Sequence, residues 1–257
     1  MIKKICRIPL LFLLLFSTAI NTLAAENSSS WYIKRNGNKR PAIQSEQEMI
    51  YDYDGYFIDK KCSDDDENKV LYLTFDLGYE NGNTEKILDV LKEENIKAAF
   101  FILDNIVLKN SELVTRMKED GHLICNHTKN HKNICNLSDG EIAKNLTDLE
   151  ELYYEKTGYK MDKFFRFPEG RYSEQALRCV QKLGYKTIFW SFAYDDWDNN
   201  RQMNEEKAIN KILSNTHNGA VMLFHPTSKT NAAIFPSLIK AWRESGYSFG
   251  TLYDLVK

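Results

Sequence analysis

The sequence predicts an α/β fold, specifically a distorted (β/α) barrel with about seven parallel strands in a single domain. Two observations support this prediction. From residue 70 onward, short runs rich in β-branched and aromatic residues alternate with longer helical patterns, and strict β/α alternation implies a parallel sheet. The chain has 257 residues, and seven strands at this length favour a barrel over an open sheet.

The composition supports a folded, neutral protein. Apolar residues make up 43% of the chain, with only 12 Gly and 5 Pro, so the sequence is not low-complexity and can bury a core. The 34 Lys and Arg residues nearly balance the 36 Asp and Glu residues. No basic face is therefore expected to neutralise phosphates, and nucleic acid is not an expected partner.

Residues 1–25 have the pattern of a secretory signal peptide. Lys3, Lys4 and Arg7 precede an apolar run over residues 8–20, and small residues follow up to Ala25. The run is shorter than the roughly 20 residues of a membrane-spanning helix, so no stable membrane span is expected. We therefore expect export across the cytoplasmic membrane, with an uncleaved leader that acts as an anchor as the alternative.

Residues 26–69 differ in composition from the rest of the chain. The segment begins with serines and ends in the acidic, polar run 63–68, which cannot bury itself. Aromatic residues such as Trp31, Tyr51 and Phe57 lie between these ends. We expect an N-terminal extension packed on the body, which is itself predicted to be one catalytic domain over 70–257.

The strands and helices of the body follow in order. Seven apolar runs predict the strands, which are 70–75, 98–102, 122–126, 163–167, 186–190, 220–224 and 247–250. The helices between them have recognisable ends. Ser138 and Glu141 form a capping-box pattern, and glycines stand where helix C-caps are expected, at Gly121, Gly158, Gly184 and Gly246.

Polar residues follow several of these strands directly. In parallel α/β barrels the active site forms at the carboxyl ends of the strands. The residues at or just after those ends are Asp76, His127, His131, Arg166, Asp196 and His225. Because each stands at the same predicted edge, we expect these side chains to gather in one site.

The pair His127 and His131 has i, i+4 spacing. On a helical turn this spacing places both imidazoles on one side, where they can share a metal ion. The alternative is two solvated histidines in a polar loop. Their position after a predicted buried strand favours the metal pair.

Three further residues complete a set that could catalyse hydrolysis. Asp76 ends an apolar strand and is a candidate base, with a turn residue as the alternative. Arg166 could hold the Asp76 carboxylate, with a surface charge as the alternative. His225 could donate a proton or be a satisfied core histidine. A base, a metal pair, an orienting arginine and an acid together describe metal-assisted hydrolysis.

The residues just described carry a resemblance to a known family. The chain from residue 70 to residue 257 resembles the polysaccharide deacetylases, carbohydrate esterase family four. The motifs occur in the family's order, as Thr74-Phe75-Asp76-Leu77-Gly78, Asn126-His127-Thr128-x-x-x-His131, Arg166-Phe167-Pro168-Glu169-Gly170, Asp196-Trp197 and Leu223-Phe224-His225.

The resemblance implies a role for each motif residue. Asp76 would be the catalytic base, oriented by Arg166, and His225 the general acid, tuned by Asp196. His127 and His131 would bind a divalent metal ion, Zn²⁺ by analogy. The remaining motif residues would form the substrate site, with Trp197 and Leu223 lining the acetyl pocket and the backbone amide of Glu169 facing the oxyanion.

Within that family the chain looks like the δ-lactam-type N-acetylmuramic acid deacetylases of spore-forming bacteria. The runs that carry this closer resemblance are 30–32, 78–83, 189–194 and 225–231. It implies peptidoglycan glycan strands as the partner, muramic δ-lactam in the spore cortex as the outcome, and the cell wall or forespore envelope space as the location. A monomer is expected.

Two positions depart from the family pattern. Leu77 stands where most of the family has a second aspartate as a third metal ligand, and a leucine cannot bind a metal. The subgroup also tends to lack this aspartate. Phe167 stands where the family usually has a proline, which affects the backbone that presents Glu169.

Polar residues in the subgroup's runs are candidates for recognising the lactyl group of muramic acid. They are Tyr79, Glu80 and Asn81 after the proposed base and Lys229 and Asn231 after the proposed acid. Lys229 is the natural partner for a carboxylate, with a solvated loop lysine as the alternative. Two other functions stay open: an N-acetylglucosamine or chitin-type deacetylase, and a metal-poor glycan-binding pseudo-enzyme.

Overall fold

The structure, a computed structural model, describes residues 28–257. The predicted signal peptide at 1–25 lies outside the described residues. All seven strands predicted for the body are present and parallel, namely β3 (Lys69–Leu77), β4 (Ala99–Ile102), β5 (Leu123–Asn126), β6 (Asp162–Phe165), β8 (Lys186–Ile188), β9 (Ala220–Phe224) and β10 (Tyr247–Phe249). The α/β barrel-like fold class is therefore confirmed.

Strand β3 is the centre of the sheet. The sheet runs β10-β3-β4-β5-β6-β8-β2, and β9 pairs with β3 off this path, where β2 is the short strand Gly55–Tyr56. β3 pairs with β9 over residues 71–75 and with β4 over residues 74–77. Residues 71–75 are all buried, as expected for a strand covered on both faces.

The barrel is curled but incompletely closed. Strand β8 ends at Ile188, two residues earlier than the sequence predicted, and the chain continues as an irregular segment. This segment still contacts β9, because the Ser191 backbone N–H donates to the Val221 carbonyl at 3.0 Å and Leu223 N–H donates to the Phe192 carbonyl at 2.9 Å. The gap between β8 and β9 is thus bridged by irregular backbone rather than by a regular strand.

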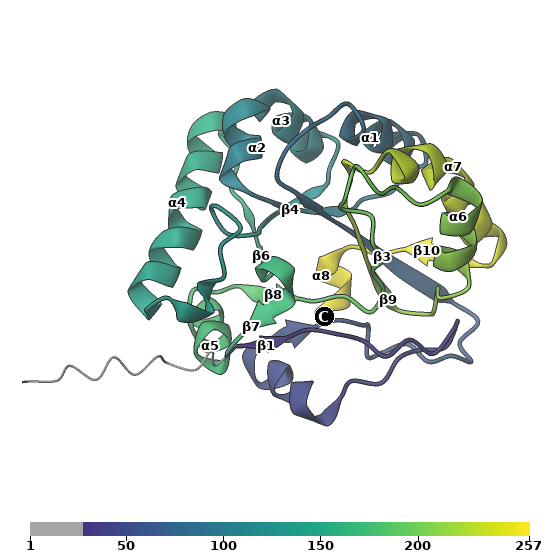
Figure 1. The fold of residues 1–257 in the computed structure, drawn as a ribbon, viewed down its shortest axis with the longest axis horizontal. Coiled ribbons are helices and arrows are strands. Elements are labelled where there is room, and N and C mark those ends of the chain that lie inside the picture. Colours follow the sequence, from purple (N-terminus) through teal and green to yellow (C-terminus); the bar gives the residue numbers. More distant parts are fainter. Residues whose placement is uncertain (1–27) are drawn as a thin grey trace, which may run out of the picture.

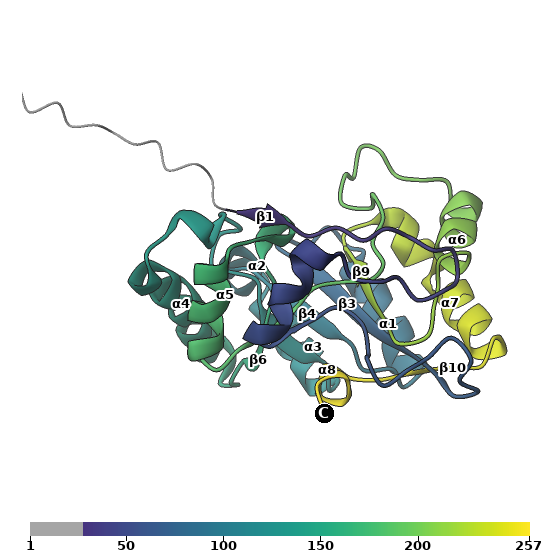
Figure 2. The same cartoon turned by 90° about the horizontal axis from the view of Figure 1, so that it is seen from below.

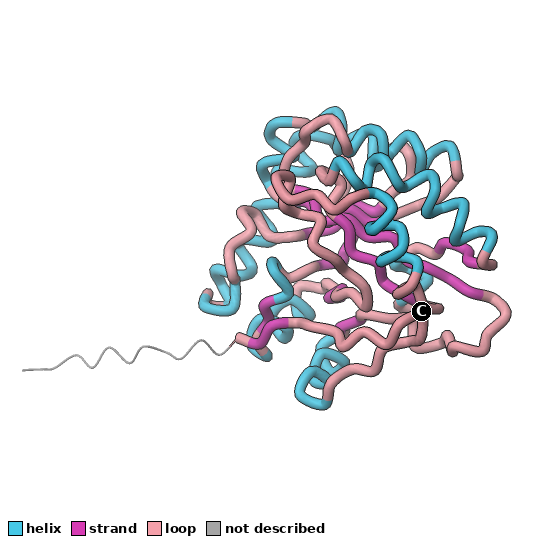
Figure 3. The backbone as a smooth tube through the Cα atoms, turned by 45° about the vertical axis from the view of Figure 1, so that its right-hand side comes forward, coloured by secondary structure: helices cyan, strands magenta, loops and turns pink. Residues whose placement is uncertain are grey.

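Helices surround the outside of the sheet (Figure 1). They are α1 (Thr84–Glu93), α2 (Asp104–Lys109), α3 (Ser111–Glu119), α4 (Asp139–Thr157), α5 (Glu174–Lys182), α6 (Glu205–Leu213), α7 (Lys229–Glu244) and α8 (Leu252–Leu255). The tube view in Figure 3 shows the strands enclosed by these helices. Within residues 28–257, no helix has the length and apolar character needed to cross a lipid bilayer.

The helix ends behave as the sequence predicted. Ser138 and Glu141 form a complete capping box at the start of α4, and Gly158 ends that helix in the left-handed conformation, with φ of 74°. Gly121, Gly184 and Gly246 also follow their helices with positive φ angles, of 86°, 82° and 82°. Local sequence therefore determined these boundaries.

The described part of the N-terminal extension, residues 28–69, lies along the body. Strand β1 (Ser29–Ser30) pairs antiparallel with β7 (Arg171–Tyr172), and a 3₁₀ segment, η1 (Ser45–Tyr53), packs near α5. Figure 2 shows the dark purple chain running from β1 toward α6. Trp31, Ile50 and Phe57 of this segment share one apolar cluster with residues of the body.

Candidate active site

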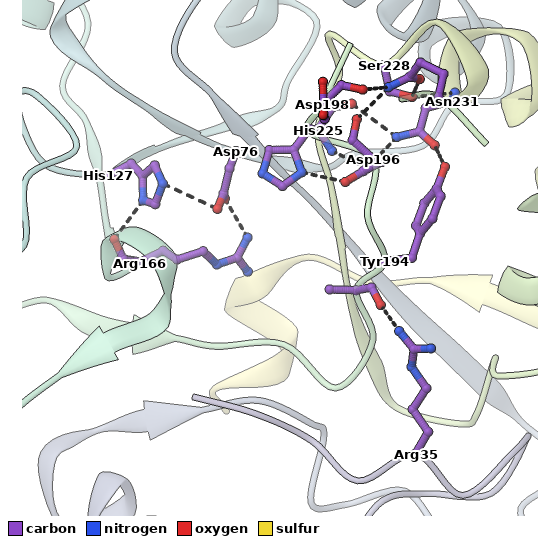
Figure 4. Close-up of polar contacts among 12 residues, drawn as sticks. Arg35, Asp76, His127, Arg166, Tyr194, Asp196, Asp198, His225, Ser228 and Asn231 are labelled. Atoms are coloured by element: carbon purple, nitrogen blue, oxygen red, sulfur yellow. Dashed lines mark hydrogen bonds and ion pairs between the residues drawn. The ribbon is translucent and has the colours of Figure 1, made fainter. Parts of the chain in front are cut away.

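The predicted site residues meet at the carboxyl edge of the sheet (Figure 4). Asp76 lies near the end of β3, His127 directly follows β5, Arg166 directly follows β6 and His225 directly follows β9. Neighbouring parallel strands end on the same edge, so residues distant in sequence come together there. The sheet therefore brings together the side chains that the sequence selected.

Asp76 is held by Arg166 and lies beside His127. Its Oδ1 accepts a hydrogen bond from Arg166 Nη1 at 2.8 Å, and its Oδ2 lies 3.4 Å from His127 Nε2. Burial alone would raise the pKa of Asp76, but the positive charge of Arg166, together with His127 and His225, outweighs burial and lowers it. The carboxylate is therefore ionised at neutral pH and fixed in orientation.

Arg166 is fully buried, with a side-chain exposure of 0%. Its guanidinium also donates to Thr74 Oγ1 at 2.9 Å and to the Ile188 carbonyl at 3.0 Å. Its Cζ lies 4.2 Å from the centroid of the Phe101 ring. A buried cation needs such partners, so the surface-charge alternative for Arg166 is wrong.

His127 is a buried, neutral imidazole. Its Nδ1 lies 2.9 Å from the Arg166 carbonyl, an acceptor, so this nitrogen carries the proton. Burial, the largest influence, lowers the pKa of His127 to about 4. The unprotonated Nε2 therefore keeps its lone pair, in the orientation typical of a metal-ligating histidine held by a carbonyl.

His127 and His131 are close together, but not because of a helix. Their ring centroids are 5.0 Å apart, while residues 127–131 form a loop, so the expected helical turn is wrong. Thr128 and His131 both adopt left-handed conformations, with φ of 71° and 58°. The Thr128 hydroxyl accepts from the His131 N–H at 3.0 Å and stabilises this turn.

The donor set fits a divalent metal ion through these two imidazoles. His127 is oriented through its Nδ1 hydrogen bond, and both histidines line the same cavity. Across residues 28–257, no group of three or more His, Cys, Asp or Glu side chains has the arrangement of a metal site. Leu77 also lines the cavity and supplies no donor, so a metal ion here would take its remaining ligands from Asp76, water or substrate.

His225 forms the second charged pair of the site. Its Nδ1 lies 2.7 Å from Asp196 Oδ1, and its backbone N–H donates to Asp196 Oδ2 at 2.8 Å. Burial alone would lower the pKa of His225, but the charge and hydrogen bond of Asp196 outweigh burial and raise it. His225 is therefore held with Nδ1 on the carboxylate and Nε2 available to donate a proton.

Two residues support Asp196, namely Asn231, which the sequence analysis named only as a candidate for substrate recognition, and Tyr194, to which it gave no role. Asn231 Nδ2 donates to Asp196 Oδ2 at 2.7 Å, and the Tyr194 hydroxyl donates to Asn231 Oδ1. Both residues are buried, and Figure 4 shows them on the side of Asp196 that is away from Asp76. They stand within the runs 189–194 and 225–231 that carried the closer resemblance, which was the available signal.

The site opens into a cavity of about 610 Å³. Besides Asp76, Leu77, His127, His131 and His225, its lining includes Gly78, Tyr79, Leu103, Glu169, Trp190, Ala193, Tyr194, Trp197, Leu223 and Thr227. Trp197 remains 55% exposed, and its ring lies 6.2 Å from that of His225. The cavity thus joins a buried polar floor to an exposed aromatic rim.

Besides Asn231, three predicted substrate residues are not part of the cavity lining. Asn81 Nδ2 donates to the Thr227 carbonyl at 2.8 Å and joins the two loops, while Glu80 accepts from the Gly82 N–H in its own loop. Lys229, the exposed first residue of α7, lines a separate hollow beside Glu205. Their contact with substrate stays a prediction.

Comparison with known proteins identifies the family. The family model for polysaccharide deacetylases matches residues 63–188. The chain is 34% identical to peptidoglycan-N-acetylmuramic acid deacetylase PdaA of Bacillus subtilis, over 99% of this chain and 96% of that protein. The solved structure of Bacillus subtilis PdaA, described as a family 4 carbohydrate esterase, superposes with a TM-score of 0.84 and 33% identity, covering 90% of this chain and 97% of that one.

A second relative differs in name and in extent. Peptidoglycan-N-acetylglucosamine deacetylase PgdA of Listeria monocytogenes is 31% identical over 73% of this chain but only 39% of that protein. The two charged pairs that face one cavity at the carboxyl edge of this parallel sheet suit the hydrolase chemistry of such deacetylases. The chain belongs to the polysaccharide deacetylase family, the family 4 carbohydrate esterases.

Proposed function

We propose that this protein hydrolyses the acetamide of N-acetylmuramic acid in peptidoglycan, which releases acetate and leaves a free amine. The amine then closes on the lactyl carboxyl to give muramic δ-lactam in the spore cortex. The observation that carries the proposal is the match to a named N-acetylmuramic acid deacetylase along nearly the whole chain. The two charged pairs that face one cavity support it chemically.

The first step needs a base, and Asp76 fits this role. Its pKa lies below the ordinary value, so it is ionised and can accept the proton of an attacking water. Arg166 fixes the carboxylate through Oδ1 and leaves Oδ2 on the side of His127. The base therefore acts from a fixed direction, as general base catalysis requires.

The second step needs an acid for the leaving amine. His225 lines the same cavity as Asp76. Asp196 raises the pKa of His225 and fixes its ring. The proton on Nε2 can then pass to the amine nitrogen as the carbon–nitrogen bond breaks, which leaves a neutral imidazole. Trp197 and Leu223, which flank this region of the cavity, would enclose the acetyl methyl group.

Between these steps a negative charge develops on the acetamide oxygen. Glu169 has a left-handed conformation, with φ of 55° and ψ of 10°, and lines the cavity, so its backbone N–H is the proposed donor to this oxyanion. His127 and His131 would hold a divalent metal ion, Zn²⁺ by analogy. Such an ion would supply Lewis-acid polarisation of the carbonyl.

The proposal also places the protein in its surroundings. A signal peptide at 1–25 would direct export, and its removal would release the protein into the cell wall or forespore envelope space, where peptidoglycan lies. One monomer carries every residue named in the site. The site therefore needs no second subunit, and peptidoglycan glycan strands are the proposed partner.

The decisive experiment compares substrates on purified protein. Acetate release should be measured with peptidoglycan strands whose muramic acid has lost its peptide, and with chitin oligomers as the control. Mass spectrometry of the digested strands should locate the lost acetyl group on muramic acid. Loss of acetyl groups from glucosamine alone would favour the function of the PgdA relative, and binding without acetate release would indicate a pseudo-enzyme.

A further inference from the structure

We propose that residues 29–35 form a strap that positions one wall of the active cavity, and that Arg35 is a positioning residue for the reaction. The wall is the irregular segment 190–194, which supplies Trp190, Ala193 and Tyr194 to the cavity lining. The inference rests on the proposed deacetylase activity and extends it to the N-terminal extension. No residue of the strap itself lines the cavity.

The wall lacks the regular support of a strand. Strand β8 ends at Ile188, and the following backbone bonds to β9 only through Ser191 and Phe192 among the contacts of the described chain. Ala193 and Tyr194 line the cavity, but they lie beyond these backbone hydrogen bonds to β9. Other contacts are therefore needed to hold the wall in one conformation.

The strap holds the near end of the wall through Trp31. The Trp31 indole Nε1 donates to the Trp190 carbonyl at 2.9 Å, and its ring stacks on Phe189 with centroids 4.5 Å apart. Its backbone N–H donates to the Gly170 carbonyl at 2.9 Å. Gly170 follows Glu169, so Trp31 joins two parts of the cavity lining.

Gly170 shows how closely these parts are packed. A Cβ atom at this position would lie 2.8 Å from the Trp190 ring and 2.9 Å from Trp31 Cβ. Its φ of +66° also disfavours any other residue. The strap, the loop that carries Glu169 and the wall therefore meet without free space.

The strap holds the far end of the wall through Arg35. Its Nη2 donates to the Ala193 carbonyl, and its Cζ lies 5.5 Å from the centroid of the Phe192 ring. Figure 4 shows Arg35 reaching toward the backbone next to Tyr194. A planar guanidinium can donate and stack on a ring at the same time, which an ammonium does poorly.

The far end of the wall leads directly to the acid. Tyr194, next to Ala193, donates to Asn231, which donates to Asp196, the partner of His225. A shift of Ala193 thus changes both the cavity wall and the support of the acid. Arg35 is exposed, so its removal alters this position without opening the core.

The test compares Arg35→Ala and Arg35→Lys with Lys34→Ala. Lys34 is the adjacent exposed cation, and its charge acts on Glu46 rather than on the wall, so it controls for loss of charge. We expect Arg35→Ala to lower kcat/KM about tenfold, mostly through KM, because one hydrogen bond to a charged group is lost. Arg35→Lys should recover part of this loss, and Lys34→Ala should match the wild type.

Two further measurements separate positioning from general stability. Millimolar guanidinium ion should restore part of the activity of Arg35→Ala and leave Lys34→Ala unchanged. Hydrogen exchange should be faster at the amides of residues 190–196 in Arg35→Ala, with an unchanged melting temperature. Wild-type kinetics and wild-type exchange in Arg35→Ala would overturn the inference.

The exchange measurement also keeps the two proposals distinct. If the wild-type protein releases no acetate from any glycan, the proposed function fails, while faster exchange at 190–196 in Arg35→Ala still supports the strap. If the wild-type protein is active and Arg35→Ala is equally active, the inference about Arg35 fails and the proposed function stands.

Discussion

At the scale of single residues, the site depends on two carboxylates in different environments. Asp76 faces a fully buried arginine, and its pKa is lowered. Asp196 faces His225, and the pKa of that histidine is raised. In the proposed mechanism the first pair would keep the base ionised and the second would keep the acid protonated, so different partners would separate the two halves of the acid–base reaction.

The first prediction concerns the base. Asp76→Asn keeps the volume and one oxygen for Arg166 but cannot accept a proton, so kcat should fall by about 10² to 10⁴-fold. Acetate release measures the rate, and circular dichroism checks the fold. Asp198→Asn is the control, because Asp198 bonds to Asn200 and lies near Arg201 rather than in the base pair. Substantial activity in Asp76→Asn would remove Asp76 from this role.

The second prediction concerns pH. His225 acts protonated, so activity should fall as the pH rises through its raised pKa. In Asp196→Asn the stabilising charge is lost and burial dominates, which lowers the pKa of His225. The alkaline limb of the kcat profile should therefore move to lower pH. An alkaline limb at the wild-type position in Asp196→Asn would show that another group limits the rate.

At the scale of elements, the loop after β5 brings the two proposed metal ligands together. The sequence spacing correctly indicated that His127 and His131 lie together, yet a left-handed turn rather than a helix achieves it. Thr128 and its hydrogen bond to the His131 N–H hold this turn. Strained backbone of this kind persists only where surrounding contacts impose it.

The third prediction tests that loop. His131→Asn tolerates the positive φ of this position but removes an imidazole ligand, so bound zinc and activity should both fall. Elemental analysis after dialysis measures the metal, and Lys132→Ala, an exposed neighbour, is the control. Zinc content equal to the wild type in His131→Asn would exclude His131 as a ligand. Active wild-type protein without stoichiometric divalent metal would refute the metal mechanism.

At the scale of the whole molecule, the N-terminal extension is part of the folded body. Trp31 is 4% exposed and packs against Phe57 and Phe189. Its neighbours Ser29 and Ser30 pair with β7. The extension therefore shares its apolar core with the barrel, which links stability to the cavity wall.

The fourth prediction measures this link. Trp31→Ala removes a buried ring and should lower the free energy of unfolding by about 3 to 5 kcal/mol. The melting temperature should fall by on the order of 10 °C. Tyr32→Ala is the control, because the Tyr32 ring is 42% exposed. Equal melting temperatures for Trp31→Ala and the wild type would show that the extension does not stabilise the body.

The sequence by itself determined the local features of this protein. β-branched runs and glycine caps specified seven strands and the helix ends, because strand preference and left-handed caps depend on neighbouring residues. The strand ends then indicated Asp76, Arg166 and His225, since parallel strands present their carboxyl ends on one edge. Motif order added the family.

Only the tertiary structure decided the contacts between distant segments. Strand β8 ends early because the chain turns to meet β9, and no local pattern encodes that meeting. Asn231 and Tyr194 support Asp196, and Arg35 reaches Ala193, through contacts that depend on the packing of separate elements. Lys229 points to a different hollow for the same reason: sequence spacing places a residue on an element, but packing decides which cavity it faces.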